Sequence, residues 1–126
     1  MDVELLAITP NPEQLIESAA RTCYQSNDRM TEESAPKLIR RLLKMGHESP
    51  LEHAYATFRL RGVSRAMTHQ LVRHRLMAVS QRSQRFVSEE GFSYVIPPSV
   101  EDGNKEEFEQ DMETIRCMYE KWREKD

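Results

Sequence analysis

Cysteine is scarce in this 126-residue chain, which has two thiols, Cys23 and Cys117, far apart in the sequence. A disulfide framework or a zinc knuckle needs closely spaced or multiple cysteines, so this pair fits neither. The sequence therefore predicts two free and buried thiols.

Long apolar runs are also missing. No stretch approaches the ~20 apolar residues of a membrane-spanning helix, and the first residues, Met-Asp-Val-Glu, lack the basic region and apolar core of a signal peptide. We expect no membrane segment and a cytoplasmic location.

Acidic residues are absent from one long stretch, although the whole chain has 21 Asp and Glu against 18 Lys and Arg and a net charge of −3. Residues 53–88 contain no Asp, Glu or Lys, and their cations are Arg59, Arg61, Arg65, Arg73, Arg75, Arg82 and Arg85. The planar guanidinium forms paired hydrogen bonds with phosphate or carboxylate, whereas Lys offers a point charge. The stretch predicts a site for a shaped anion.

Length and composition indicate one soluble domain over residues 1–126, because 38% of the residues are hydrophobic and 31% are charged. Residues 3–8 are expected to form a strand, and Pro12 to begin a helix that runs to about Tyr24. A second helix should be capped by Thr31 or Ser34 and end at Gly46. The predicted inward positions of these helices are Leu15, Ala19 and Cys23, then Leu38, Leu42 and Met45.

The second half adds two strand candidates and a long helix. Residues 55–61 alternate, which places Ala56, Phe58 and Leu60 on one face of a half-buried strand. Residues 92–96 form the other candidate. Residues 104–125 carry an apolar stripe at Phe108, Met112, Ile115, Tyr119 and Trp122, typical of a long amphipathic helix that packs on a partner surface. The fold class is α+β, a small antiparallel sheet packed with helices.

The densest group of polar side chains lies in residues 70–86. Ser64 should cap a helix over residues 65–74, on which Gln70, Arg73 and His74 share a face. Residues 80–85, if extended, place Gln81, Ser83 and Arg85 on one side. Those three side chains could line a pocket together.

Two motifs carry a resemblance to a known family. Arg73-His74-Arg75, followed after seven residues by Ser83, and the segment Gly46-His47-Glu48-Ser49-Pro50-Leu51-Glu52-His53 resemble the signatures of flavin-dependent thymidylate synthases. Ala20 to Tyr24 and Tyr94 to Pro97 are similar to weaker landmarks, so the resemblance covers roughly residues 1–100. Phe86 stands where the family usually has Tyr, Cys23 where Ser is common, and Ser80-Gln81 where many members have Asn-Glu.

The resemblance implies an FAD enzyme that methylates dUMP to dTMP, with methylenetetrahydrofolate as carbon donor and NADPH as reductant. By position, the residues that would bind FAD are Ser49, Arg73, His74, Arg75 and Gln81. Those that would bind dUMP are Gln70, Leu71, Val72, Arg73, Gln81, Arg82, Ser83, Gln84 and Arg85. Ser83 would be a binding group near the uracil ring, and no residue is assigned as a covalent nucleophile.

Family members are homotetramers with shared active sites, so the resemblance also implies a homo-oligomer. Their chains continue well past the long helix, into a part that carries a further Arg for the nucleotide. This chain is therefore expected to be the N-terminal part of such an enzyme or a shortened relative, with a half-built ligand pocket.

The same residues are compatible with other functions. An Arg-rich helix could bind nucleic-acid phosphates, but the total charge is negative and Phe86 is the one aromatic residue nearby. His47, Glu48, Glu52 and His53 could hold a metal, although their spacing is not that of a zinc protease. Ser83 and His74 could form a hydrolytic pair, but the stretch offers no acid to orient the histidine.

Overall fold

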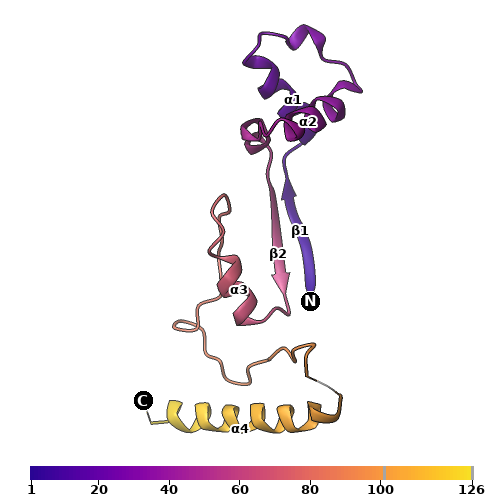
Figure 1. Ribbon diagram of the computed structural model, residues 1–126. Helices are drawn as coiled ribbons and strands as arrows, with labels where there is room; N and C mark the ends of the chain where they lie inside the picture. The colour runs from indigo at the N-terminus through magenta and orange to yellow at the C-terminus, as the bar shows by residue number, and fades with distance from the viewer. Residues whose placement is uncertain (101, 126) are drawn as a thin grey trace. The chain divides into compact units, whose positions relative to one another are not determined.

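The computed structural model describes residues 1–100 and 102–125, and over these residues it has two strands and four α-helices (Figure 1). The elements are β1 (Asp2–Ile8), α1 (Pro12–Thr22), η1 (Asn27–Arg29), α2 (Ser34–Lys44), η2 (Ser49–His53), β2 (Ala56–Arg61), α3 (Arg65–Leu71), η3 (Asp102–Asn104) and α4 (Lys105–Arg123), where η marks a 3₁₀ helix. The predicted α+β class is confirmed. The chain divides into an N-terminal unit, residues 2–60, and a C-terminal unit, residue 1 with residues 61–126.

β1 and β2 pair as a two-stranded antiparallel ribbon (Figure 1). Every residue of both strands is exposed, and the side chains of Phe58 and Leu60 are 55% and 40% exposed. The prediction that one face of residues 55–61 is half-buried is therefore wrong. Alternation gives a strand a face that can be buried, but both faces of β2 are exposed in the described residues.

Thr9 extends the pairing beyond β1. Its backbone N–H donates to the carbonyl of Tyr55 at 3.0 Å, while its hydroxyl accepts from the Tyr55 N–H at 3.0 Å and donates to the Tyr55 carbonyl at 3.2 Å. Thr9 is 8% exposed. Its hydroxyl thus fixes the point where the ribbon meets the helices of the N-terminal unit.

The core of the N-terminal unit lies between α1 and α2, which pack together, and α1 also packs on η2. Its buried apolar residues are Ile16, Ala20, Ala35 and Leu42. Leu42 confirms one predicted inward position. The other predicted positions include errors, because Leu15 and Met45 are 41% and 47% exposed.

The predicted stripe of α1 is displaced by one residue, from Leu15 and Ala19 to Ile16 and Ala20. Both stripes have the same four-residue spacing, so the periodicity did not decide between them. Cys23, the third member of the predicted stripe, is exposed, and so is Cys117. Both thiols are free, as predicted, but the prediction that they are buried is wrong.

A carboxylate is the largest fully buried side chain among the described residues. Glu17, on α1, is 0% exposed; its Oε1 accepts from Nε of Arg21 at 2.7 Å and its Oε2 accepts from the Ser34 hydroxyl at 2.8 Å. We call these three residues the Glu17 cluster. They join α1 to the first residue of α2 through paired polar groups, which is how a buried charge is tolerated.

The Glu17 cluster also corrects the predicted cap of α2. The N-cap position is Glu33, and no side chain caps it. Ser34 lies one residue later, and its hydroxyl accepts from the Thr31 N–H at 2.9 Å while reaching Glu17. A serine near a helix start usually caps the helix, but here the Ser34 hydroxyl donates to Glu17 of the neighbouring helix α1.

Gly46 ends α2 as predicted. Its φ is +70°, its N–H donates to the Leu43 carbonyl at 3.1 Å, and the His47 N–H donates to the Leu42 carbonyl at 2.9 Å. These two bonds form a Schellman motif, which requires a left-handed residue after the helix. The motif directs the chain into the segment 46–53.

In the C-terminal unit, α4 covers Lys105–Arg123 and confirms the predicted long helix. Its apolar stripe is partly exposed to solvent, since Ile115 and Trp122 are 51% and 64% exposed. The strand predicted over residues 92–96 is absent from the described structure. Instead the ring of Tyr94 packs edge-on against Phe108 of α4, with centroids 6.0 Å apart.

None of the helices described is at once long and apolar enough to cross a membrane.

Candidate anion-binding site

α3 carries the first part of the site. The Ser64 hydroxyl accepts from the Met67 N–H at 3.1 Å, which confirms the predicted cap. The helix ends at Leu71, three residues before the predicted end. Arg73 and His74 follow in a tighter turn, where their N–H groups donate to the carbonyls of Gln70 and Leu71 at 3.2 and 3.1 Å.

The early end of α3 changes how the motif is presented. Leu76 has a φ of +40°, a left-handed conformation that turns the chain sharply and is uncommon for a residue with a Cβ atom. The prediction that Gln70, Arg73 and His74 share one helical face is therefore wrong. They lie on a helix end and the turn that follows it.

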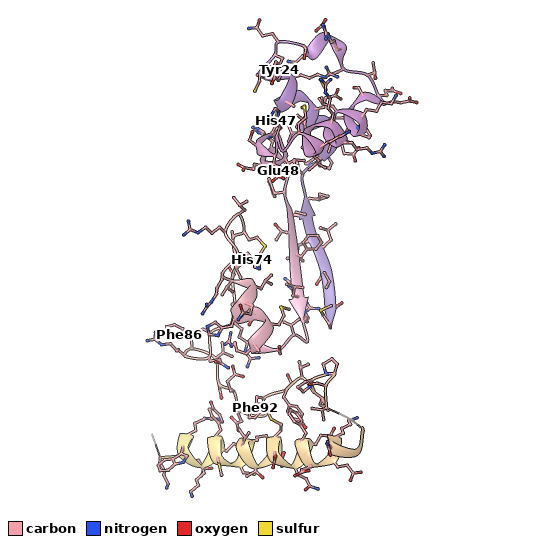
Figure 2. All side chains as sticks on the ribbon, viewed as in Figure 1. Tyr24, His47, Glu48, His74, Phe86 and Phe92 are labelled. Atoms are coloured by element: carbon pink, nitrogen blue, oxygen red, sulfur yellow. The ribbon has the colours of Figure 1, made fainter. Side chains whose placement is uncertain are left out.

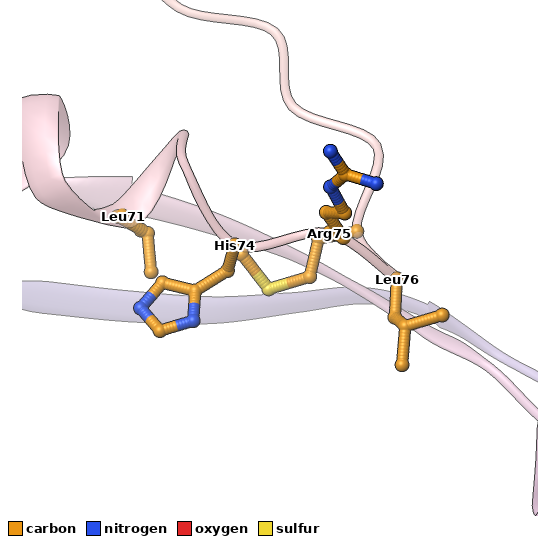
Figure 3. Close-up of a pocket in the computed structure, with 5 residues that line it drawn as sticks. Leu71, His74, Arg75 and Leu76 are labelled. Carbon is orange, nitrogen blue, oxygen red and sulfur yellow. The ribbon is translucent and has the colours of Figure 1, made fainter.

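A hollow of about 400 Å³ lies at this turn and is lined by Leu71, His74, Arg75, Leu76 and Met77. We call it the turn hollow. Figure 3 shows the Arg75 guanidinium and the Leu76 side chain directed to opposite sides of the chain. The hollow brings together three predicted site residues, Leu71, His74 and Arg75. It adds Leu76 and Met77, which sequence reasoning treated only as an apolar run.

A second hollow, of about 260 Å³, is lined by Arg65, His69, Val72, Gln81 and Gln84. We call it the amide hollow, since two glutamine amides line it. Val72, Gln81 and Gln84 are predicted site residues, whereas Arg65 and His69 are not. Arg65 lies seven residues and His69 three residues before Val72, and this spacing could have identified them, because such residues share one face of a helix.

Arg65 also fixes the segment that faces α3. Its Nη2 donates to the carbonyl of Arg82 at 3.1 Å. A guanidinium bonded to a backbone carbonyl keeps its charge, so Arg65 orders the segment and still adds to the positive potential of the amide hollow.

The segment after Ser80 is not extended through Arg85. The Ser83 hydroxyl accepts from the Arg85 N–H at 3.2 Å, and the Ser83 carbonyl accepts from the Val87 N–H at 3.1 Å. Serine side chains compete for nearby backbone groups in this way and favour turns. The prediction that Arg85 shares one side with Gln81 and Ser83 therefore does not hold.

The arginines of the acid-free stretch differ in their partners. Arg59 pairs with Glu4 at 3.4 Å and Arg82 pairs with Glu89 at 2.8 Å. Over residues 1–100 and 102–125, the side chains of Arg73, Arg75 and Arg85 have no hydrogen-bond or ion-pair partner. These three guanidinium groups are available to an anion.

Ser49 belongs to the N-terminal unit, where it begins η2. Phe86, which stands where the family usually has Tyr, is 88% exposed and labelled in Figure 2. His47 and His53 lie near Glu48 and Glu52 in sequence, but in the described structure no three such side chains form a possible metal site.

Residues 4–126 match the family model described as thymidylate synthase complementing protein. The chain belongs to this family. It is 43% identical over 127 residues to the flavin-dependent thymidylate synthase of Clostridium tetani, an alignment that covers 94% of this chain and 51% of that relative. It is 42% identical to the enzyme of the same name from Nitratidesulfovibrio vulgaris, over 93% of this chain and 53% of the relative.

A relative from Mycobacteroides abscessus is 48% identical over 90 residues, which are 70% of this chain and 36% of its own. The chain spans about half the length of the curated relatives it matches. The resemblance seen in Arg73-His74-Arg75 and in residues 46–53 is thus confirmed at the level of the thymidylate synthase complementing family.

Proposed function

We propose that the chain takes part in FAD-dependent methylation of dUMP to dTMP, with methylenetetrahydrofolate as carbon donor and NADPH as reductant. The observation that carries the proposal is that the guanidinium groups of Arg73, Arg75 and Arg85, within and next to the family motif, have no partner in the described part of the chain. The printed names of the relatives, flavin-dependent thymidylate synthases, support it.

The turn hollow fits part of a flavin nucleotide. Leu71, Leu76 and Met77 offer apolar surface for an aromatic ring, and Arg75 offers paired N–H donors for a pyrophosphate. The proposed FAD-binding residues are Ser49, Arg73, His74, Arg75 and Gln81. When bound, FAD would supply the redox chemistry of the reaction.

The proposed nucleotide-binding residues are Gln70, Leu71, Val72, Arg73, Gln81, Arg82, Ser83, Gln84 and Arg85. Arg73 and Arg85 would bind the phosphate of dUMP in a bidentate way. The amides of Gln81 and Gln84 match the donor and acceptor edge of uracil. Ser83 already accepts from the Arg85 N–H, so its own O–H proton is left to donate to a ligand.

The proposed assembly is a cytoplasmic homotetramer with shared active sites. The exposed apolar side chains of the ribbon and of α4, such as Phe58, Ile115 and Trp122, support contact between copies, because patches of this kind mark interaction surfaces.

Flavin titration tests the proposal directly. We expect the protein to quench the fluorescence of FAD on binding, Arg75→Gln to weaken this binding, and Arg40→Gln to leave it unchanged. Arg40 is exposed on α2 and has no partner among the described residues, so it controls for the lost charge. Tritium release from labelled dUMP, with FAD, NADPH and methylenetetrahydrofolate supplied, then tests turnover.

A colourless protein that does not quench FAD would contradict the proposal. The rival function, binding to nucleic-acid phosphates, predicts instead an affinity for oligonucleotides that falls steeply with salt, because each phosphate contact releases counterions.

A further inference from the structure

α4 holds the segment that follows the arginine-rich motif. The Glu89 N–H donates to the hydroxyl of Tyr119 at 3.2 Å, and the Glu90 carboxylate pairs with Arg123, one turn further along α4. This pairing raises the pKa of Arg123 above its ordinary value. The Glu90 N–H also donates to the Ser88 hydroxyl at 3.2 Å. The backbone of residues 88–90 is thereby fixed against one face of the helix.

The fixed segment presents an acid to the motif. The carboxylate of Glu89 accepts from Nη2 of Arg82 at 2.8 Å, and the same nitrogen lies 3.5 Å from the Ser88 carbonyl. The Glu89 side chain is 21% exposed and that of Arg82 is 59% exposed. Arg82 therefore differs from Arg73, Arg75 and Arg85, which have no acidic partner among the described residues.

We propose that Glu89, positioned by Tyr119, is an internal competitor for the anion that binds at Arg82. A carboxylate and a phosphate present similar oxygen pairs to a guanidinium, so both cannot occupy the same N–H donors. To bind the Nη2 donor of Arg82, the nucleotide phosphate must displace Glu89. This inference rests on the proposed nucleotide site and concerns the regulation of its affinity.

The exposure of the pair sets how strongly Glu89 competes. Arg82 is exposed although Glu89 is partly buried, and ion pairs that remain open to solvent are weak and are screened by salt, so a phosphate can displace the carboxylate. The strength measured for such pairs corresponds to about two- to fivefold in affinity. Removing the competing charge should tighten anion binding by that factor at low salt, and by less at high salt.

Two matched variants test the proposal. Glu89→Gln and Glu90→Gln remove the same charge from adjacent residues, but Glu90 pairs with Arg123 and not with Arg82. In calorimetric titrations with dUMP, Glu89→Gln should bind about two- to fivefold more tightly than the unmodified protein, and Glu90→Gln should bind much as the unmodified protein does. Tyr119→Phe, which releases the Glu89 backbone, should give a smaller gain. Equal effects of the two glutamine variants, or no gain for Glu89→Gln, would overturn the proposal.

A second measurement does not depend on dUMP. Phenylglyoxal modifies free arginines, and peptide mass spectrometry can follow Arg82 with Arg40 as an internal reference, because Arg40 is exposed on α2 and lies outside the proposed site. Arg82 should react faster in Glu89→Gln than in the unmodified protein. The concentration of inorganic phosphate that halves its reaction rate, the half-protecting concentration, should be lower in this variant. An unchanged half-protecting concentration refutes the competition. Loss of dUMP binding in all proteins, with the shift in phosphate protection still present, would instead refute the proposed function and leave the competition supported.

Discussion

Replacing Arg21 should destabilise the N-terminal unit more than any exposed arginine would. Glu17 is 0% exposed and the Arg21 side chain is 14% exposed, with 2.7 Å between Nε and Oε1. Arg21→Met keeps a long apolar side chain but leaves the carboxylate with one donor, Ser34. Breaking a buried ion pair from one side costs about 3–5 kcal/mol of the free energy of unfolding.

Further variants separate the contributions of the Ser34 hydrogen bond and the Glu17–Arg21 ion pair to this loss of stability. Ser34→Ala removes one hydrogen bond to a charged group, which is worth about 1.5–3 kcal/mol. The double variant Glu17→Leu with Arg21→Met removes both charges, and such replacements by apolar residues are often near neutral. The double variant should therefore be more stable than Arg21→Met alone.

Urea unfolding followed by far-UV circular dichroism measures these differences. Tryptophan fluorescence would not report on them, since the single tryptophan, Trp122, lies on α4 in the C-terminal unit. Arg40→Met is the control, and as an exposed substitution it should change the free energy of unfolding by less than about 0.5 kcal/mol. If Arg21→Met and Arg40→Met lose equal stability, the Glu17 cluster does not hold α1 to α2.

Three further outcomes are expected. Gly46→Ala should lose about 1–2 kcal/mol of unfolding free energy, because a residue with a Cβ atom is strained at φ +70°, although nothing lies within 4 Å of that atom. Gly103→Ala, also in open space but without a positive φ, should lose less. Equal losses of the two variants in urea unfolding would exclude backbone strain as the cause. Ser64→Ala should cost about 1 kcal/mol by removing the cap of α3, and an unchanged unfolding midpoint would show that the cap is not needed. Arg85→Lys should weaken dUMP binding by about 1.5–3 kcal/mol, whereas Arg59→Lys should not; equal affinities in calorimetry would refute the role of Arg85.

Local signals in the sequence predict the structure where one residue type has one strong preference. Gly46 ends α2, Ser64 caps α3, and the stripe of α4 marks a helix, because each depends on a few neighbouring residues. The errors came where two local solutions were equally good. Ile16 and Leu15 both continue a four-residue stripe, and the choice of Ile16 depends on packing that α1 makes only after folding.

Tertiary contacts also give some polar side chains partners that differ from those predicted from the sequence. The Ser34 hydroxyl was expected to cap α2 and instead bonds Glu17, seventeen residues away along the chain. Tyr94 was expected in a strand and instead packs on Phe108. Neither partner can be identified from spacing, since each comes from another element.

In the candidate site, too, the ion pairs could not be predicted from the distribution of charge along the sequence. The stretch without acids ends at Ser88, and the very next residue, Glu89, folds back to pair with Arg82. At the other end of the stretch, Glu4 pairs with Arg59 across the ribbon. Separation of charge along a sequence therefore does not ensure separation in space. Among the described residues, the guanidinium groups without a partner are those of Arg73, Arg75 and Arg85. The positive site is therefore smaller than the seven arginines of the stretch suggested, and Arg59 and Arg82 can bind a ligand only where it displaces their acidic partners.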